Sequence, residues 1–200
     1  AIMPVHLLGK PAKMREIMVI AKRFNLRVIE DSCETMFVKG VATGDVSCFS
    51  FYIAHLLTTG VGGMAITNNK ALSDLIRSLI FHGRDNKYLT IDDDKTPTKE
   101  IINARFRFNY PGYSSRSTEM EAALGLVELK SYKKMIDKRQ KNAQYLVAAL
   151  GTGPLEGGYL KNHAFMMFPY FSKKRDELIL FMEERGITTR TIMPLINQPY

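Results

Sequence analysis

Apolar positions in the first third of the chain follow two different periods, which predict alternating strands and helices. Short apolar runs of the kind found in buried strands cover residues 2–8, 26–29, 46–51 and 63–67. Between the first two runs, apolar side chains recur at helical spacing at Met14, Ile17, Met18 and Ala21. A strand–helix–strand order with continuous apolar strands favours an α/β fold with a parallel-rich sheet.

A helix and a long loop are predicted next. Asn69 is of the residue type preferred at helix N-caps, and the helical pattern after it ends near Gly83. Residues 84–116 are polar and irregular, so we expect a loop there, with Asp92, Asp93 and Asp94 in an exposed turn.

The last helix of the first domain is predicted in two pieces. Thr118 and Glu121 have the spacing of a capping box, which predicts a helix through Leu129. A longer amphipathic helix is expected over residues 131–150.

A domain boundary is predicted at residues 151–158, which contain four glycines and a proline. The chain is therefore divided into residues 1–150, a large α/β domain with its long helix, and residues 151–200, the start of a smaller α/β domain. Within the second domain we expect strands at 163–171 and 187–192, with a helix at 175–185 between them.

Composition narrows the classes of partner. The 200 residues carry a net charge of +8, but the basic residues are spread along helical patterns with interleaved acids, so we expect solvated helix faces and no nucleic-acid partner. No apolar run of about 18 residues is present, so no membrane partner is expected. Two cysteines make no disulfide framework and favour the cytoplasm.

Four residues carry the candidate chemistry of the first domain. Asp31 ends the second predicted strand, Glu34 follows three residues later, and Ser50 precedes His55 by five. A buried carboxylate can keep a heteroaromatic nitrogen protonated, a serine can bind a phosphate, and an imidazole can transfer protons near neutral pH. Each residue also has an ordinary structural role, as a capping acid, a turn hydroxyl or a packed histidine. The spacing alone therefore suggests a phosphate-bearing cofactor without establishing one.

Several motifs together resemble the DegT-type sugar aminotransferase family. They are PVHLLGKPAKMREI, LRVIEDSCE, GDVSCFSFYIAHLLTTGVGGMAITNN, IFHGRD, GYSSRSTEMEAALGLVEL and RGITTR. The resemblance implies the fold type I (aspartate aminotransferase-like) architecture of enzymes that use pyridoxal 5'-phosphate or pyridoxamine 5'-phosphate. It also implies that the chain is a fragment, with about a hundred residues before Ala1 and a truncated small domain, and that the protein is a homodimer.

The resemblance assigns roles to individual positions. Asp31 stands where the family pairs a carboxylate with the cofactor's pyridine nitrogen, and Glu34 where it places a polar residue near the ring hydroxyl. Ser50 resembles the phosphate-binding serine. Ser114 replaces an asparagine that reaches the phosphate of the neighbouring subunit's cofactor. His55 occupies the position of the lysine that anchors the cofactor covalently.

The histidine directs the functional expectation. The same replacement marks the family's nucleotide-sugar 3-dehydratases, in which the histidine acts as the catalytic base on a nucleotide-linked 4-keto-6-deoxy sugar, with an amino donor such as glutamate. The first alternative is a sugar aminotransferase of the same family. The second is a non-catalytic regulatory or structural relative. Two cysteines are too few for an iron–sulfur cluster, and no metal site is expected.

Overall fold

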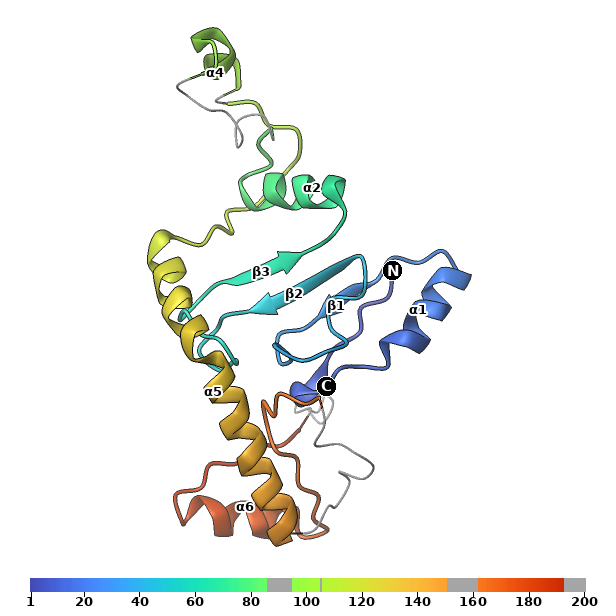
Figure 1. The fold of residues 1–200 in the computed structure, drawn as a ribbon, viewed down its shortest axis with the longest axis vertical. Helices are drawn as coiled ribbons and strands as arrows, with labels where there is room; N and C mark the ends of the chain where they lie inside the picture. Colours follow the sequence, from blue (N-terminus) through green and yellow to red (C-terminus); the bar gives the residue numbers. More distant parts are fainter. Residues whose placement is uncertain (86–94, 105, 151–161, 193–200) are drawn as a thin grey trace.

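A three-stranded sheet lies at the centre of the chain (Figure 1). The computed structural model describes residues 1–85, 95–104, 106–150 and 162–192. The strands follow the order β1 (Ile29–Asp31), β2 (Val46–Ser50) and β3 (Gly63–Ile66). β1 and β2 are parallel, whereas β2 and β3 are antiparallel. The strands predicted at 46–51 and 63–67 are therefore confirmed in a mixed sheet, whereas the strand predicted at 26–29 shares only Ile29 with β1.

The first predicted strand forms only in part. Ile2 and Val5 make isolated parallel bridges to Val28 and Asp31, so residues 2–5 extend the parallel side of the sheet beyond β1. The chain then turns into a short 3-10 helix, η1 (Leu7–Gly9). The turn follows from backbone conformation, because Leu8 has a φ of 60° and Gly9 one of 101°.

Two predicted helices flank the sheet as expected. Helix α1 (Met14–Arg23) packs beside β1, where Met14 and Ala21 form a buried cluster with Val28. Helix α2 (Lys70–Ile80) lies beyond β3 (Figure 1). The Asn69 side chain caps it by accepting a hydrogen bond from the Leu72 amide at 3.2 Å.

The predicted loop at 84–116 contains a helix, so that expectation is wrong in part. Helix α4 (Thr98–Ala104) begins after Pro97, whose carbonyl accepts the amides of Glu100 and Ile101. Proline suits a helix start because its missing N–H is not needed there. The predicted turn at Asp92–Asp94 lies outside the described residues.

The two helices predicted between residues 118 and 150 are one. Helix α5 (Glu119–Leu150) has 32 residues and runs without a break through Lys130 and Ser131. No proline or glycine stands at that point, so nothing stops the helix. The capping box is confirmed, since the Glu121 carboxylate accepts hydrogen bonds from the amide and hydroxyl of Thr118.

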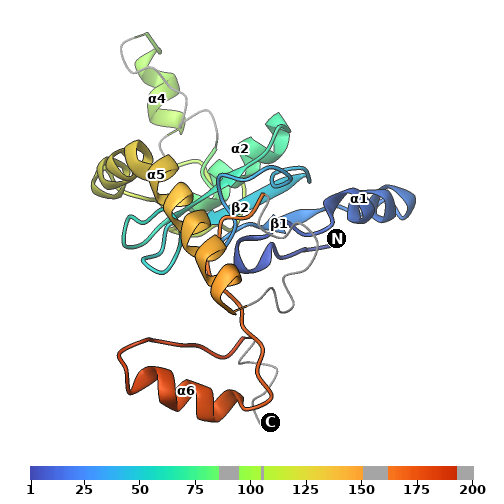
Figure 2. The same ribbon diagram turned by 60° about the horizontal axis from the view of Figure 1, so that its bottom comes forward.

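The second predicted domain forms its helix but not its strands. Helix α6 (Arg175–Glu183) matches the expectation and lies past the end of α5, away from the sheet (Figures 1 and 2). Residues 163–171 and 187–192 are not strands. Phe165 has a φ of 48°, which interrupts extended backbone, and the neighbouring Ala164 amide bonds to the Gly9 carbonyl at 2.8 Å. The predicted boundary at 151–158 lies outside the described residues, so the domain division stays a prediction.

One buried cluster joins these elements. It links the sheet, the loop after β2, helix α5 and the segment at 163–167 through Met36, Phe49, Leu56, Leu57, Ile136 and Ala164. The loop between β2 and β3 is therefore held by packing on α5.

Substitution of Gly9 by alanine is expected to destabilise the fold strongly. A Cβ at Gly9 would lie 2.7 Å from the backbone nitrogens of Phe165 and Met166, and neither of these backbone atoms has a flexible side chain's freedom to move away. We expect a loss of about 3 kcal/mol or more, measured by urea unfolding. Gly186→Ala is the matched control, because Gly186 also has a positive φ of 72° but no atom within 4 Å of the added Cβ. Its cost should be about 1 kcal/mol. Equal losses in both variants would refute the predicted clash.

Acid should destabilise the protein through His163. This side chain is fully buried, and its Nδ1 accepts a hydrogen bond from the Phe165 amide at 2.9 Å. Burial, with the nearby charge of Lys10, lowers the pKa of His163 from 6.5 to about 4. Because the folded pKa is lowered, the stabilisation is complete above pH 6.5 and is lost as the pH falls toward 4. We expect a loss of about 2–3 kcal/mol between roughly pH 7 and pH 4.5.

The control for this pH dependence is His163→Asn, which keeps an acceptor for the Phe165 amide but does not titrate. Urea unfolding across the same pH range should give the variant a flatter stability curve than the wild type. An unchanged slope would show that other groups cause the acid sensitivity.

Candidate functional site

The side chains of Asp31 and Ser50 project from the same face of the sheet. Asp31 pairs with Cys48 in the β1–β2 register, and Ser50 lies two residues further along β2. Residues two apart in a strand share a face and lie about 7 Å apart. The opposite face carries buried Ser47 and Phe49, of which Phe49 packs in the cluster with Ile136 of α5. The candidate site thus lies on the half-buried face, at the end of β1 and β2.

Hydrogen bonds with nearby backbone groups hold Asp31 in position. Its Oδ1 accepts a hydrogen bond from the Cys33 amide at 3.1 Å, and its backbone amide donates to the Pro4 carbonyl at 2.9 Å. The Cys33 thiol also hydrogen-bonds to this carboxylate. Because an ionised carboxylate has about four lone-pair sites, the positioned Asp31 side chain can accept a further hydrogen bond.

The Ser50 hydroxyl can donate a hydrogen bond to a ligand. Its Oγ accepts a hydrogen bond from the Tyr52 amide at 3.2 Å, which fixes the side chain at the end of β2. Since a hydroxyl both accepts and donates, the hydrogen of Ser50 can still be donated to an anion such as a phosphate.

His55 stands on a tight loop between β2 and β3. Its backbone amide donates to the Tyr52 carbonyl at 2.9 Å, and the Thr59 amide donates to the Phe51 carbonyl at 2.9 Å. Leu56 and Leu57, which follow it, are both only 5% exposed and anchor the loop in the core.

The imidazole of His55 is half-buried and presents two different nitrogens. The ring lies edge-on to Tyr52, with 6.2 Å between ring centroids. Its Nδ1 is shielded from solvent and lacks a hydrogen-bond partner in the described part of the chain. The accessible nitrogen is therefore Nε2. A buried polar atom without a partner is uncommon and points to a group that the described residues do not supply.

The other two predicted residues make contacts with other parts of the chain. Glu34 accepts a hydrogen bond from the Leu8 amide at 2.6 Å, so its carboxylate caps the turn at η1. Ser114 is exposed and bridges to Phe81, just after α2. The structure thus places Asp31 and Ser50 at the ends of neighbouring strands and His55 on the loop that follows β2, while Glu34 and Ser114 contact other elements.

The cysteines beside Asp31 are free thiols. Burial, followed by the hydrogen bond and charge of Asp31, raises the pKa of Cys33 to about 12. Burial and the charge of Asp31 also raise the pKa of Cys48. Both side chains therefore remain protonated near neutral pH and act as packing groups. In the described ranges, no cluster of three or more His, Cys, Asp or Glu side chains is arranged to hold a metal ion.

Sequence reasoning missed a buried pair next to the site. The Nε2 of His6 lies 2.7 Å from the Glu30 carboxylate, and both side chains are fully buried. Glu30 also accepts the amides of Ala42, Thr43 and Gly44. Burial by itself would raise the pKa of Glu30, but hydrogen bonds from Gly44, His6, Thr43 and Ala42 bring it below its usual value. The sequence carried one signal of this pair. Side chains alternate between the two faces of a strand, so Glu30 must face the side opposite to Asp31.

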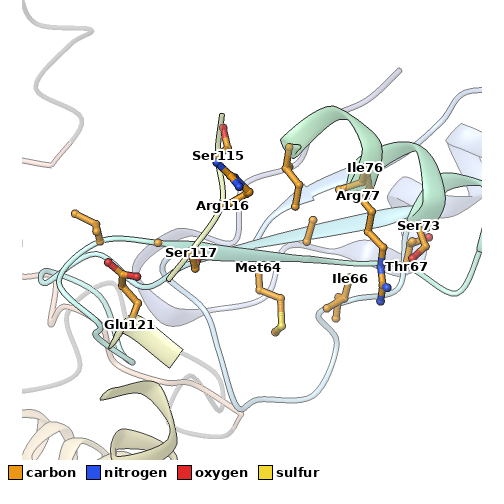
Figure 3. A pocket seen from close by; sticks show the side chains of 15 residues that line it. Met64, Ile66, Thr67, Ser73, Ile76, Arg77, Ser115, Arg116, Ser117 and Glu121 are labelled. Carbon is orange, nitrogen blue, oxygen red and sulfur yellow. The ribbon is translucent and has the colours of Figure 1, made fainter. Parts of the chain in front are cut away.

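A separate groove of about 830 Å³ runs along the outer side of β3 (Figure 3). Its walls come from residues 61–67, from α2 with Ser73 and Arg77, and from Ser115, Arg116 and Ser117. Asp31, Ser50 and His55 do not line it.

The polar groups on the sheet face, an acceptor at Asp31 and a donor at Ser50, fit a phosphorylated cationic ring. Asp31 offers a carboxylate oxygen to a ring N–H, and Ser50 offers a hydroxyl hydrogen to a phosphate. Such a ligand requires both of these groups, and the two project from one face of the sheet.

Throughout the described part of the chain, no helix is both long and apolar enough to cross a bilayer.

Comparisons with known proteins identify a family for the whole chain. The sequence matches the DegT/DnrJ/EryC1/StrS aminotransferase family over residues 1–200. It is 31% identical over 227 residues to the lipopolysaccharide biosynthesis protein RfbH of Salmonella typhimurium, covering 100% of this chain and 52% of that protein. It is 33% identical over 210 residues to a pleiotropic regulatory protein of Geobacillus stearothermophilus, covering 98% and 51%.

A solved structure shows the same fold. The E. coli GDP-4-keto-6-deoxy-D-mannose-3-dehydratase with bound hydrated PLP superposes with a TM-score of 0.75 and 25% identity, covering 94% of this chain and 52% of that one. The chain therefore spans about half the length of the relatives it matches. These matches confirm the predicted α/β fold of PLP-dependent enzymes. With a match over its whole length, the chain belongs to the DegT/DnrJ/EryC1/StrS aminotransferase family.

Proposed function

We propose that the protein is a nucleotide-sugar 3-dehydratase, which removes the C3 hydroxyl from a nucleotide-linked 4-keto-6-deoxy sugar. The observation that carries the proposal is His55. It stands on the loop after Ser50, at the position that the resemblance assigns to the family's anchor lysine, and the packing of Leu56 and Leu57 holds the loop in place. An imidazole cannot anchor the cofactor covalently but can serve as a base.

Asp31 and Ser50 are the residues we assign to cofactor binding. The Asp31 carboxylate would accept the ring N–H and keep the ring cationic, and Ser50 would donate its hydroxyl hydrogen to the phosphate. For the complete protein, we propose that Glu34 lies near the ring hydroxyl of the cofactor. Ser114 would contact the phosphate of the cofactor in the partner subunit. When bound, pyridoxamine phosphate supplies an amine for the C4 carbonyl of the sugar, a methylene carbon that can lose a proton, and an electron-withdrawing ring.

His55 would move one proton in two steps. Its Nε2 would take up one proton, and the resulting imidazolium would donate it to the C3 hydroxyl as the C3–O bond breaks. One water leaves and the histidine returns to its neutral form. An imidazole suits this sequence because its ordinary pKa lies close to neutral pH.

Substrates and partners follow from the family. The E. coli relative is named for its action on a GDP-linked 4-keto-6-deoxy sugar, and RfbH is named for lipopolysaccharide biosynthesis. We therefore propose a nucleotide-linked keto sugar as substrate and glutamate as amino donor, in the cytoplasm.

We further propose a homodimer. Phe106, Tyr113 and Met120 are each at least 70% exposed, on the segment around Ser114 and the start of α5. Apolar side chains gathered in this way favour an interface with a second subunit.

The test uses the full-length protein with pyridoxamine phosphate and nucleotide-linked 4-keto-6-deoxy sugars, followed by mass spectrometry of the sugar. The proposal predicts a product that lacks the C3 oxygen. An amino sugar that retains this oxygen would instead favour the aminotransferase, which the family's name makes the leading alternative. A protein that binds no cofactor would favour a regulatory role, as in the name of the Geobacillus relative.

A further inference from the structure

The hydrogen bonds around the buried pair of His6 and Glu30 determine which nitrogen of the imidazole carries the hydrogen. The Nδ1 of His6 accepts the Ala12 amide at 2.9 Å, so this nitrogen carries no hydrogen. The ring hydrogen is then on Nε2, which donates to the Glu30 carboxylate at 2.7 Å. The pair is thus a neutral imidazole that donates to a carboxylate, with every polar atom of the imidazole satisfied.

Glu30 also fixes the turn that leads into β2. Its carboxylate accepts hydrogen bonds from Ala42 at 2.8 Å, from Thr43 at 2.6 Å and from Gly44. Three successive amides around one anion form a nest, and Ala42 adopts a φ of 59°, which L-residues rarely adopt. The carboxylate stabilises this backbone conformation.

The same network holds the backbone of Asp31. The His6 amide donates to the Asp31 carbonyl at 2.9 Å, and the Thr35 hydroxyl donates to the His6 carbonyl at 2.8 Å. Glu30 and Asp31 are consecutive in β1 and point to opposite faces of the sheet. Fixing Glu30 and His6 on one face therefore fixes where the Asp31 carboxylate projects on the other.

We propose that the His6–Glu30 pair is a positioning unit for Asp31, which sets the carboxylate against the ring nitrogen of the cofactor without touching it. This inference rests on the proposed role of Asp31. At metal sites, loss of a group that orients a direct ligand typically changes affinity by about 10–100-fold, and we expect an effect of this order here.

The experiment measures cofactor binding to the full-length protein, independent of turnover. The dissociation constant of pyridoxal phosphate and the absorption spectrum of the bound cofactor, which reports ring protonation, are compared for the wild type and for Glu30→Gln, Asp31→Asn and the double variant. We expect Glu30→Gln to weaken binding about ten-fold and to shift the spectrum in the same direction as Asp31→Asn. The double variant should bind no more weakly than Asp31→Asn alone, because both substitutions weaken the same contact, between the Asp31 carboxylate and the ring nitrogen of the cofactor.

Ser47→Ala is the matched structural control. Ser47 is buried, pairs with Glu30 in the β1–β2 register, and shares a hydrogen bond of 2.7 Å with Ser32. Its loss should lower the melting temperature but leave the affinity and the spectrum unchanged. If Glu30→Gln does not fold, His6→Gln tests the same unit while the carboxylate keeps its three backbone donors.

The outcomes separate the two proposals. If Asp31→Asn itself leaves binding and spectrum unchanged, the assignment of Asp31 to the cofactor is wrong. If Asp31→Asn has its effect but Glu30→Gln and His6→Gln behave like Ser47→Ala, the positioning unit is refuted while the proposed function stands.

Discussion

Replacement of His55 by asparagine should reduce dehydration of the nucleotide sugar by about 10²–10⁴-fold, the range typical for loss of a general acid–base group. Asparagine keeps a polar side chain of similar size but cannot accept and return a proton near neutral pH. Because Leu56 and Leu57 anchor the loop in the core, the substitution should leave the fold intact. The measurement is kcat for release of the sugar that lacks its C3 oxygen, with the melting temperature recorded in parallel.

His82→Asn is the control for this substitution. His82 lies after α2 with a φ of 62°, a conformation that asparagine tolerates, and it packs edge-on against Phe81. Its turnover should stay close to that of the wild type. A His55→Asn variant that retains most of the dehydration rate would remove the histidine from the proton-transfer step.

Replacement of Asp31 by asparagine should have the second largest effect. The amide cannot stabilise a cationic ring, so the cofactor loses much of its capacity to withdraw electrons. Removal of one such electrostatic contact typically costs about 10²–10³-fold in rate. We expect a fall of this size in kcat, together with a change in the absorption of the bound cofactor. The cofactor spectrum of Asp31→Asn and its turnover are measured on the same preparation.

Asp45→Asn provides the comparison for Asp31. Asp45 also holds backbone near the sheet, where it accepts the Val28 amide at 2.8 Å, and it pairs with Arg27 at 2.9 Å. Its substitution should affect stability and leave the cofactor spectrum as in the wild type. Identical spectra for wild type and Asp31→Asn would mean that another group contacts the ring nitrogen.

Local patterns predicted the starts of helices α2 and α5. Asn69 and the Thr118–Glu121 pair mark helix starts because their side chains bond to nearby backbone amides, an interaction contained within a few residues. The break predicted after Leu129 was wrong because it rested on a change of pattern without a residue that stops a helix.

Strands were harder to predict, because they depend on partners far away in the sequence. Residues 163–171 have the composition of a strand, yet the Ala164 amide bonds to Gly9 and Phe165 turns out of extended backbone. The orientation of β3 was also open, since an apolar run carries no information about direction.

The candidate site was predictable in part. Asp31, Ser50 and His55 come from motifs that lie close together in the sequence, and the β1–β2 register explains why the first two share a face. The His6–Glu30 pair joins residues 24 apart and depends on tertiary contacts with the turn at 42–44, so no local spacing reveals it.

The central claim is that His55 has taken the place of a covalent anchor. The most direct test adds pyridoxal phosphate to the full-length protein, reduces the mixture with borohydride and measures the intact mass. We expect bound cofactor in the spectrum but no covalent adduct for the wild type, and an adduct for His55→Lys. An adduct on a lysine of the wild-type protein would contradict this role of His55 and make aminotransferase the leading function.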